Sequence, residues 1–109
     1  EGGYVQGAGW LMCEELVWSP DGRLATHAPA TYKIPCASDR PMDTRVAIWG
    51  PGQNRELTVK RSKAVGEPPL MLAISAHQAI GAAIASVRND FHQPDAPATP
   101  ERILAALDG

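Results

Sequence analysis

Apolar residues recur along residues 4–16 with the spacing of one helix face. They are Tyr4, Val5, Ala8, Leu11, Met12 and Leu16. This spacing is typical of an amphipathic helix. Glycines at 2, 3, 7 and 9 weaken an isolated helix by up to ~1 kcal/mol each. Because Gly3 and Gly7 share a face, we expect them to permit close approach to a neighbouring backbone or ligand. The pattern predicts a short, tightly packed, glycine-rich helix.

Extended segments are predicted around two turns. Residues 16–18 and 23–26 flank Ser-Pro-Asp-Gly at 19–22, which predicts a hairpin with proline at the second turn position. Two further strands are predicted at 44–49 and 56–60, on either side of a Gly-Pro-Gly-Gln-Asn turn. The intervening stretch contains three prolines between residues 27 and 42 and reads as an irregular connection.

Two more helices are predicted in the second half of the chain. Residues 69–89 are rich in Ala, Leu and Ile, and Pro69 suits the first helical turn, where its missing N–H costs nothing. A polar linker follows at 90–98, and Thr99 then serves as N-cap of a short helix over residues 99–108. The expected fold class is α+β, with the hairpin and short strands packed against the three helices in one unit over residues 1–109.

Composition narrows the class of protein. The net charge of −2 gives no reason to expect nucleic acid or an anionic membrane as partner. We see no apolar run close to the ~20 residues that span a bilayer, and no signal peptide. Cys13 and Cys36 are far apart, which favours free thiols in a reducing, cytoplasmic compartment. The chain begins with Glu1 instead of Met, which suggests a segment of something longer.

Glu67 is the first candidate for chemistry. Pro68 biases Glu67 toward extended geometry, and Gly66 permits backbone angles that a side chain would forbid. The free N–H groups at the start of the following helix favour the ionised carboxylate, whereas burial would oppose it. Such a carboxylate is suited to act as a general base. The residues alone favour the simpler interpretation, an acidic side chain that complements the helix dipole.

Other polar groups give weaker signals. His27, His77 and His92 lack metal-ligand spacing, and His77, within the long helix, is expected to be packed or hydrogen-bonded. We therefore expect no metal ligand from the protein. Lys60, Arg61 and Lys63 form a basic cluster, for which a solvated strand end is favoured over contact with an anionic cofactor or a neighbouring subunit.

Several blocks carry a family resemblance. Residues 63–70, K-A-V-G-E-P-P-L, resemble a signature of molybdenum hydroxylases of the xanthine dehydrogenase and aldehyde oxidase family. E-G-G-Y-V-Q-G-A-G at 1–9, E-E-L at 14–16, S-P-D-G at 19–22, T-Y-K-I-P at 31–35 and D-A-P-A-T-P-E-R at 95–102 are similar to other blocks of the family, in the same order. The resemblance covers nearly the whole chain and identifies it as a C-terminal fragment of a molybdopterin-binding domain.

The resemblance implies roles for three residues. Glu67 matches the family's catalytic base, which accepts a proton as the substrate is hydroxylated. Gly66 is expected to lie against the cofactor, and Gln6 is a further candidate for the same contact. The implied cofactor is molybdenum held by molybdopterin, with electrons passing to NAD through 2Fe–2S clusters and FAD on other domains or subunits.

The resemblance also implies an activity and partners. The full enzyme is expected to convert hypoxanthine to xanthine and xanthine to urate, in an oligomeric enzyme. Its other parts would be the remainder of the molybdenum subunit and the iron–sulfur and FAD units. This segment alone is expected to be inactive. Two alternatives stay open: an aldehyde oxidase-like or other aza-heterocycle hydroxylase, and a non-catalytic assembly or interaction domain. For a fragment we expect exposed apolar surface on the first helix or the long one.

Overall fold

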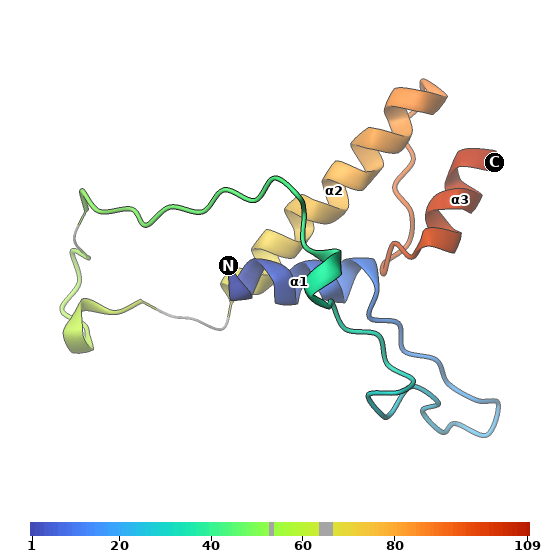
Figure 1. Cartoon of the computed structure of the whole chain (residues 1–109), viewed down its shortest axis with the longest axis horizontal. Helices are drawn as coiled ribbons and strands as arrows, with labels where there is room; N and C mark the ends of the chain where they lie inside the picture. The colour runs from blue at the N-terminus through green and yellow to red at the C-terminus, as the bar shows by residue number, and fades with distance from the viewer. Residues whose placement is uncertain (53, 64–66) are drawn as a thin grey trace.

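The computed structural model describes residues 1–52, 54–63 and 67–109, and its regular structure there is helical. Over these ranges it contains three α-helices, α1 (Gly2–Met12), α2 (Pro68–Arg88) and α3 (Pro100–Asp108), as Figure 1 shows. Two 3₁₀ turns, η1 (Ala37–Asp39) and η2 (Val59–Arg61), interrupt the loops. The three predicted helices are therefore present, although α1 ends four residues earlier than the apolar spacing indicated.

The expected α+β class is wrong for this chain, because no strand forms among the described residues. In place of the hairpin, a turn at 19–22 is closed by a single antiparallel bridge between Trp18 and Leu24. Residues 44–49 run extended and pair with no other described segment, and the segment predicted as a strand at 56–60 enters η2. A two-stranded hairpin is marginal in water without further strands or a helix to cover it. The described chain supplies no such sheet.

Close packing of α1 across the start of α2 forms the main helix contact (Figure 1). A Cβ atom added to Gly7 would lie 2.8 Å from the carbonyl carbon of Pro69 and 2.9 Å from the Cβ of Ala73. A Cβ on Gly3 would lie 3.5 Å from the Cγ of Pro69. The predicted close backbone approach is therefore confirmed at Gly7, whereas at Gly3 a Cβ would make only an ordinary van der Waals contact.

Local signals explain both ends of α2. Pro68 and Pro69 occupy its first turn, where no intrahelical N–H bond is required. Asn89 ends the helix in the left-handed conformation, with φ of 65°, and its N–H donates to the Ala85 carbonyl. By length and composition alone α2 is also apolar enough to cross a membrane, with a mean hydropathy of 1.6, contrary to our reading of the sequence. A core helix of a soluble protein meets the same criterion.

The C-terminal segment is tied back to both other helices. The hydroxyl of Thr99 accepts a bond from the Arg102 N–H, as predicted for an N-cap. Arg102 Nη2 lies 2.7 Å from Glu15 Oε1, just beyond the end of α1. Arg88 Nη1 donates to the Ala106 carbonyl at 2.7 Å and so joins α2 to α3. These contacts fix the three helices relative to one another.

The hydrophobic core is small. Its buried hydrophobic side chains among the described residues are Ala73, Ile84, Ala98 and Ala106, none of them large except Ile84. The radius of gyration is 17.4 Å, against ~13 Å for a compact domain of this length. Much of the excess comes from residues 40–63, hereafter the arm, whose described residues extend away from the helices (Figure 1).

Candidate functional site

Glu67 is the N-cap residue of α2 and its side chain is exposed. Its backbone is helical, with φ of −82° and ψ of −33°, so the extended geometry expected before Pro68 is wrong. The Glu67 carbonyl accepts a bond from the Leu70 N–H at 3.1 Å, which draws the residue into the first helical turn. Its carboxylate makes no capping bond and is thus free to act on another molecule at the positive end of a long helix.

Of the other two predicted site residues, the structure describes only Gln6. Gly66 lies outside the described residues. Gln6 is exposed on α1, next to Gly7, where α1 contacts Pro69. Because Pro69 follows Glu67 by two positions, the α1–α2 crossing brings the elements that carry Gln6 and Glu67 together. Both side chains are open to solvent there. The arrangement is consistent with one wall of a site whose other walls come from elsewhere.

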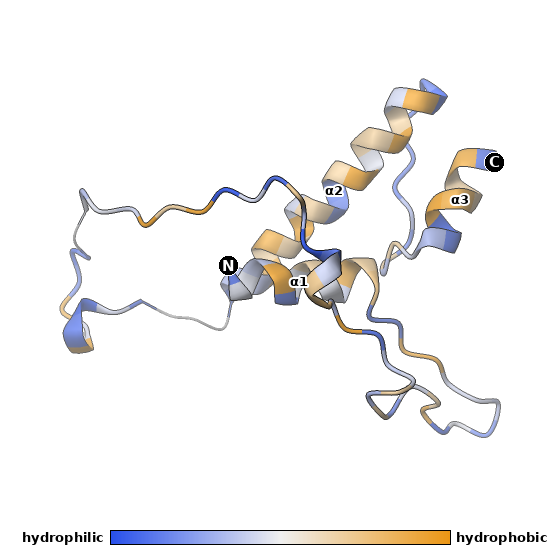
Figure 2. Ribbon diagram, viewed as in Figure 1, coloured by the Kyte–Doolittle hydropathy of each residue, from blue (hydrophilic) through white to orange (hydrophobic). Residues whose placement is uncertain are grey.

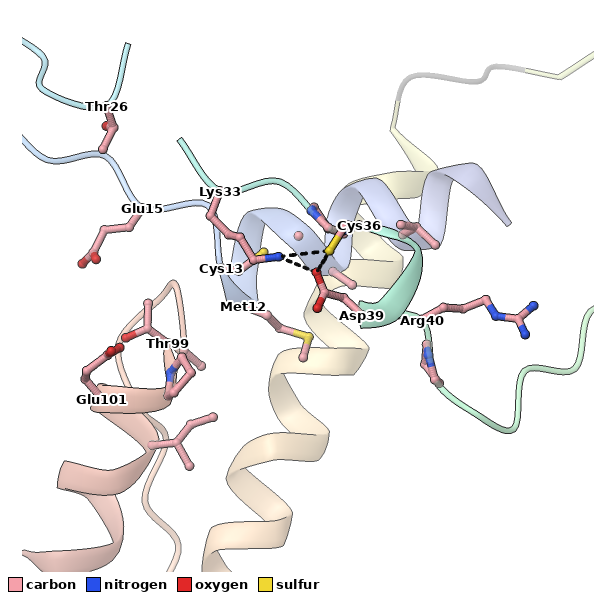
Figure 3. A pocket seen from close by; sticks show the side chains of 18 of the residues that line it. Met12, Cys13, Glu15, Thr26, Lys33, Cys36, Asp39, Arg40, Thr99 and Glu101 are labelled. Carbon is pink, nitrogen blue, oxygen red and sulfur yellow. Dashed lines mark hydrogen bonds and ion pairs between the residues drawn. The ribbon is translucent and has the colours of Figure 1, made fainter. Parts of the chain in front are cut away.

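A separate pocket of about 1220 Å³ lies between α1, the loop before the arm and the start of α3. Figure 3 shows side chains from all three elements around it, among them Met12, Lys33 and Thr99. Neither Gln6 nor Glu67 is among its lining residues. The structure therefore does not bring the expected catalytic base to this pocket.

A small polar cluster marks one side of this pocket. Asp39 Oδ2 accepts bonds from the Cys36 N–H at 2.9 Å and from the Cys36 thiol at 3.0 Å, and it pairs with the ammonium of Lys33 (Figure 3). The backbone N–H of Cys36, followed by Lys33 and the thiol, holds the pKa of Asp39 well below its usual range. The cluster fixes the η1 turn, since each group belongs to residues 33–39.

Cys13 lines the same pocket from the end of α1. Burial raises the pKa of its thiol, and nearby acidic groups add to that effect, whereas Lys33 opposes it. Both cysteines are free thiols. Over the described ranges, no group of three or more His, Cys, Asp or Glu side chains is arranged to hold a metal ion.

His77 is hydrogen-bonded within the structure, as predicted. Its Nδ1 lies 2.9 Å from Nε2 of Gln93, which also donates to the His77 carbonyl at 2.8 Å. Gly81, one turn further along α2, leaves room for the Gln93 amide. No pattern in the sequence indicated Gln93 as its partner. The pair anchors the linker after α2 and has no direct link to Glu67.

The cluster of Lys33, Cys36 and Asp39 was also missed from the sequence. Its members stand three residues apart, but in a proline-containing loop that spacing predicts no common face. The pattern that could have indicated this cluster is a capping pair. Cys36 and Asp39 form such a pair at the start of a short helical turn, but the turn itself was not predicted.

Comparison with known proteins places the chain in a family. Residues 1–41 match the family profile described as Molybdopterin cofactor-binding domain. Over 97% of its length the chain is 44% identical to xanthine dehydrogenase/oxidase of Rattus norvegicus and 46% identical to that of Gallus gallus. It is 41% identical, over 99% of its length, to xanthine dehydrogenase of Oryza sativa subsp. japonica.

The match is nearly complete for this chain but small for its relatives. The aligned part spans 8% of the rat and chicken proteins and 9% of the rice protein. The similarity extends well beyond residue 41, through the parts of the chain that hold α2 and α3. The chain therefore belongs to the xanthine dehydrogenase family, in which it corresponds to a short segment of the full-length proteins.

Proposed function

We propose that this chain is the part of a molybdenum hydroxylase that supplies the catalytic base Glu67 to a site completed by the rest of the protein. The observation that carries the proposal is the 41–46% identity to xanthine dehydrogenases over nearly the whole chain. The activity proposed for the full-length protein is hydroxylation of hypoxanthine and xanthine to urate. The segment by itself is inactive.

The exposed surface supports assembly with a larger body. The solvent-accessible area is 8681 Å², whereas a monomeric globular protein of this mass exposes ~5,800 Å². Figure 2 shows apolar residues along much of α2, and Leu70, Met71, Leu72, Ile74 and Val87 are exposed on it. Val5, Trp10 and Met12 are exposed on α1. Apolar surface of this extent is typical of a face that packs against other protein.

The position of Glu67 suits a base. A general base must reach the proton it accepts, and the Glu67 carboxylate is exposed and uncapped at the N-terminus of α2. The helix fixes its backbone, because Pro68 and Pro69 restrict the first turn. In the full-length protein, the apolar residues around the start of α2 would be covered, which would remove water from this carboxylate.

The proposed cofactor is molybdenum–molybdopterin, which supplies the redox chemistry of hydroxylation when bound. The exposed Gln6 amide and the carboxylate of Glu67, both at the α1–α2 crossing, are the described groups that would face it. The amide offers a donor and an acceptor to a polar ring system such as a pterin. Gly66 is assigned to the same contact. We place the 2Fe–2S and FAD centres on other parts of the enzyme.

The decisive test is Glu67→Gln in the full-length protein. Replacing a general base removes ~10²–10⁴-fold of rate, so xanthine hydroxylation is expected to fall by at least ~100-fold. Molybdenum content should remain normal because the amide keeps the side-chain shape. Glu101→Gln is the matched control, since Glu101 also stands in the first turn of a helix and is exposed. Retained turnover in Glu67→Gln with a full complement of molybdenum would refute the assignment.

The alternatives differ in what the full-length protein does. Turnover of aldehydes or other heterocycles, without turnover of xanthine, would assign it to the aldehyde oxidase-like branch. A parent protein that binds no molybdenum and turns over none of these substrates would instead favour a non-catalytic assembly domain. We propose a cytoplasmic, oligomeric enzyme. In this setting α2 is a core helix rather than a membrane span, because its exposed apolar side chains would meet the rest of the protein.

A further inference from the structure

The arm differs in charge from the remainder of the chain. Residues 40–63 contain six basic and two acidic side chains, a net charge of +4, whereas the whole chain carries −2. The rest of the chain therefore carries −6. Arg45 pairs with Asp43 at 2.7 Å, but the arm as a whole remains strongly basic. A surface that receives the arm should be acidic, because like charges brought together would oppose docking.

Large apolar side chains of the arm also point into solvent. Ile48 and Leu57 are each 96% exposed, and Trp49 is 82% exposed. Met42, Val46 and Val59 are exposed as well. Figure 2 shows these apolar positions interspersed with polar ones along the arm. This segment leaves a tryptophan, two leucine-sized side chains and a methionine exposed to water. Such exposure is characteristic of a contact surface rather than of a solvated loop.

In one part of the arm, residues 45–49, the backbone is unoccupied as well. Residues 45–49 form no backbone hydrogen bond with any other described residue. By contrast, the loop at residues 31–39 is tied to itself and to Glu14 by side-chain bonds. Peptide groups and apolar side chains are thus both presented outward along 45–49. An extended segment with these properties binds through its backbone and through pockets for its side chains.

We propose that the arm is a docking segment that seats, with residues 45–49 extended, on an apolar groove with an acidic rim in the remainder of the full-length protein. The choice of partner rests on the proposed function, in which the chain is part of a longer protein. The chain spans only 8–9% of its relatives, so most of their length lies outside it. Ile48, Trp49 and Leu57 supply the apolar anchors. Arg45, Arg55 and Lys60 supply the charge that selects the rim.

Hydrogen exchange on the full-length protein tests the proposal without requiring activity. The amides of residues 45–49 should exchange at least ~100-fold more slowly than in an unstructured peptide, because docking must open before they exchange. The same amides in the 109-residue chain alone should exchange at nearly the unstructured rate. Rapid exchange of 45–49 in the full-length protein would overturn the proposal, whatever the outcome of the Glu67 experiment.

Two variants define the chemistry of the groove. Ile48→Asp and Arg55→Glu in the full-length protein should each reduce protection of residues 45–49 by ~10-fold or more. Arg23→Glu is the matched control, because Arg23 is an exposed arginine in the turn at 19–22, outside the arm. Equal effects of Arg23→Glu and Arg55→Glu would contradict the acidic rim. Protection in the isolated chain that rises with protein concentration would contradict the proposed partner and point to a second copy.

Discussion

One carboxylate oxygen of Asp39 accepts bonds from three donors, although Asp39 lies on an exposed loop. The donors are the N–H and thiol of Cys36 and the ammonium of Lys33. Together they fix the conformation of the 33–39 loop, which lines the pocket. At this scale the sequence was least informative, since the three residues meet through a loop conformation that no periodic pattern encodes. Glu67 could be singled out because it stands between a glycine and a proline just before a helix, although the extended backbone expected there does not form.

The Asp39 cluster predicts a pH response. Folding lowers the pKa of Asp39 below its ordinary 3.8, so the interaction is fully present above that value and is lost as the pH falls through the lowered pKa. Carboxyl-carbon NMR of the chain should therefore place the Asp39 midpoint well below 3.8. Lys33→Ala should move the midpoint upward. Arg45→Ala is the control, because Arg45 pairs with Asp43. An Asp39 that titrates at its ordinary value would contradict the cluster.

Elements with local signals were predicted well. The two prolines at the start of α2, the N-cap Thr99 of α3 and the glycines of α1 act within a few residues of where they stand. The strands failed for the opposite reason. β-Branched residues at alternating positions, as in residues 44–49, favour a β-strand. A strand also needs a partner to pair with, and the described chain does not supply one. The close crossing of α1 and α2 was foreseen only as a need for space at Gly3 and Gly7.

The helix crossing makes Gly7 the most sensitive small residue. Gly7→Ala would push a methyl group against the Pro69 carbonyl and the Cβ of Ala73. Overpacking of this kind should lower the free energy of unfolding by about 1–3 kcal/mol. Gly2→Ala is the matched control, since a Cβ there meets nothing within 4 Å, and it should leave stability unchanged or raise it by up to ~1 kcal/mol. Urea unfolding measures both, and equal stability of the two variants would argue against the crossing.

At the scale of the whole molecule, the chain is an open assembly of helices with an arm. The radius of gyration of 17.4 Å and the four small or medium side chains of its core describe a body that buries little by itself. Composition could not reveal this. A chain that is 44% hydrophobic reads as an ordinary globular domain, and only the structure shows how much of that apolar surface stays exposed. The family resemblance, in contrast, was readable from ordered sequence blocks.

The open shape predicts where protease acts first. Trypsin should cut the 109-residue chain at Arg45 and Arg55 before Arg88 and Arg102. Cleavage requires local unfolding, and few contacts of the arm would have to break for it. Arg88 and Arg102 are held by the bonds to Ala106 and Glu15. Mass spectrometry of a brief digest would order the cuts. In the full-length protein, docking should slow cleavage at Arg45 and Arg55. Initial cleavage at Arg88 would contradict the described helix contacts.

The bond between Arg102 and Glu15 joins residues 87 positions apart in the chain. The Ala98 N–H donates to the Leu11 carbonyl over a similar span, at 2.7 Å. Contacts between such distant positions must overcome the entropy of closing a long loop before they contribute. During synthesis, therefore, α1 leaves the ribosome long before the residues that secure its far end exist. The apolar side chains of α1 lack these contacts for that interval, which leaves the helix open to non-native contacts until residues 98–102 have been made.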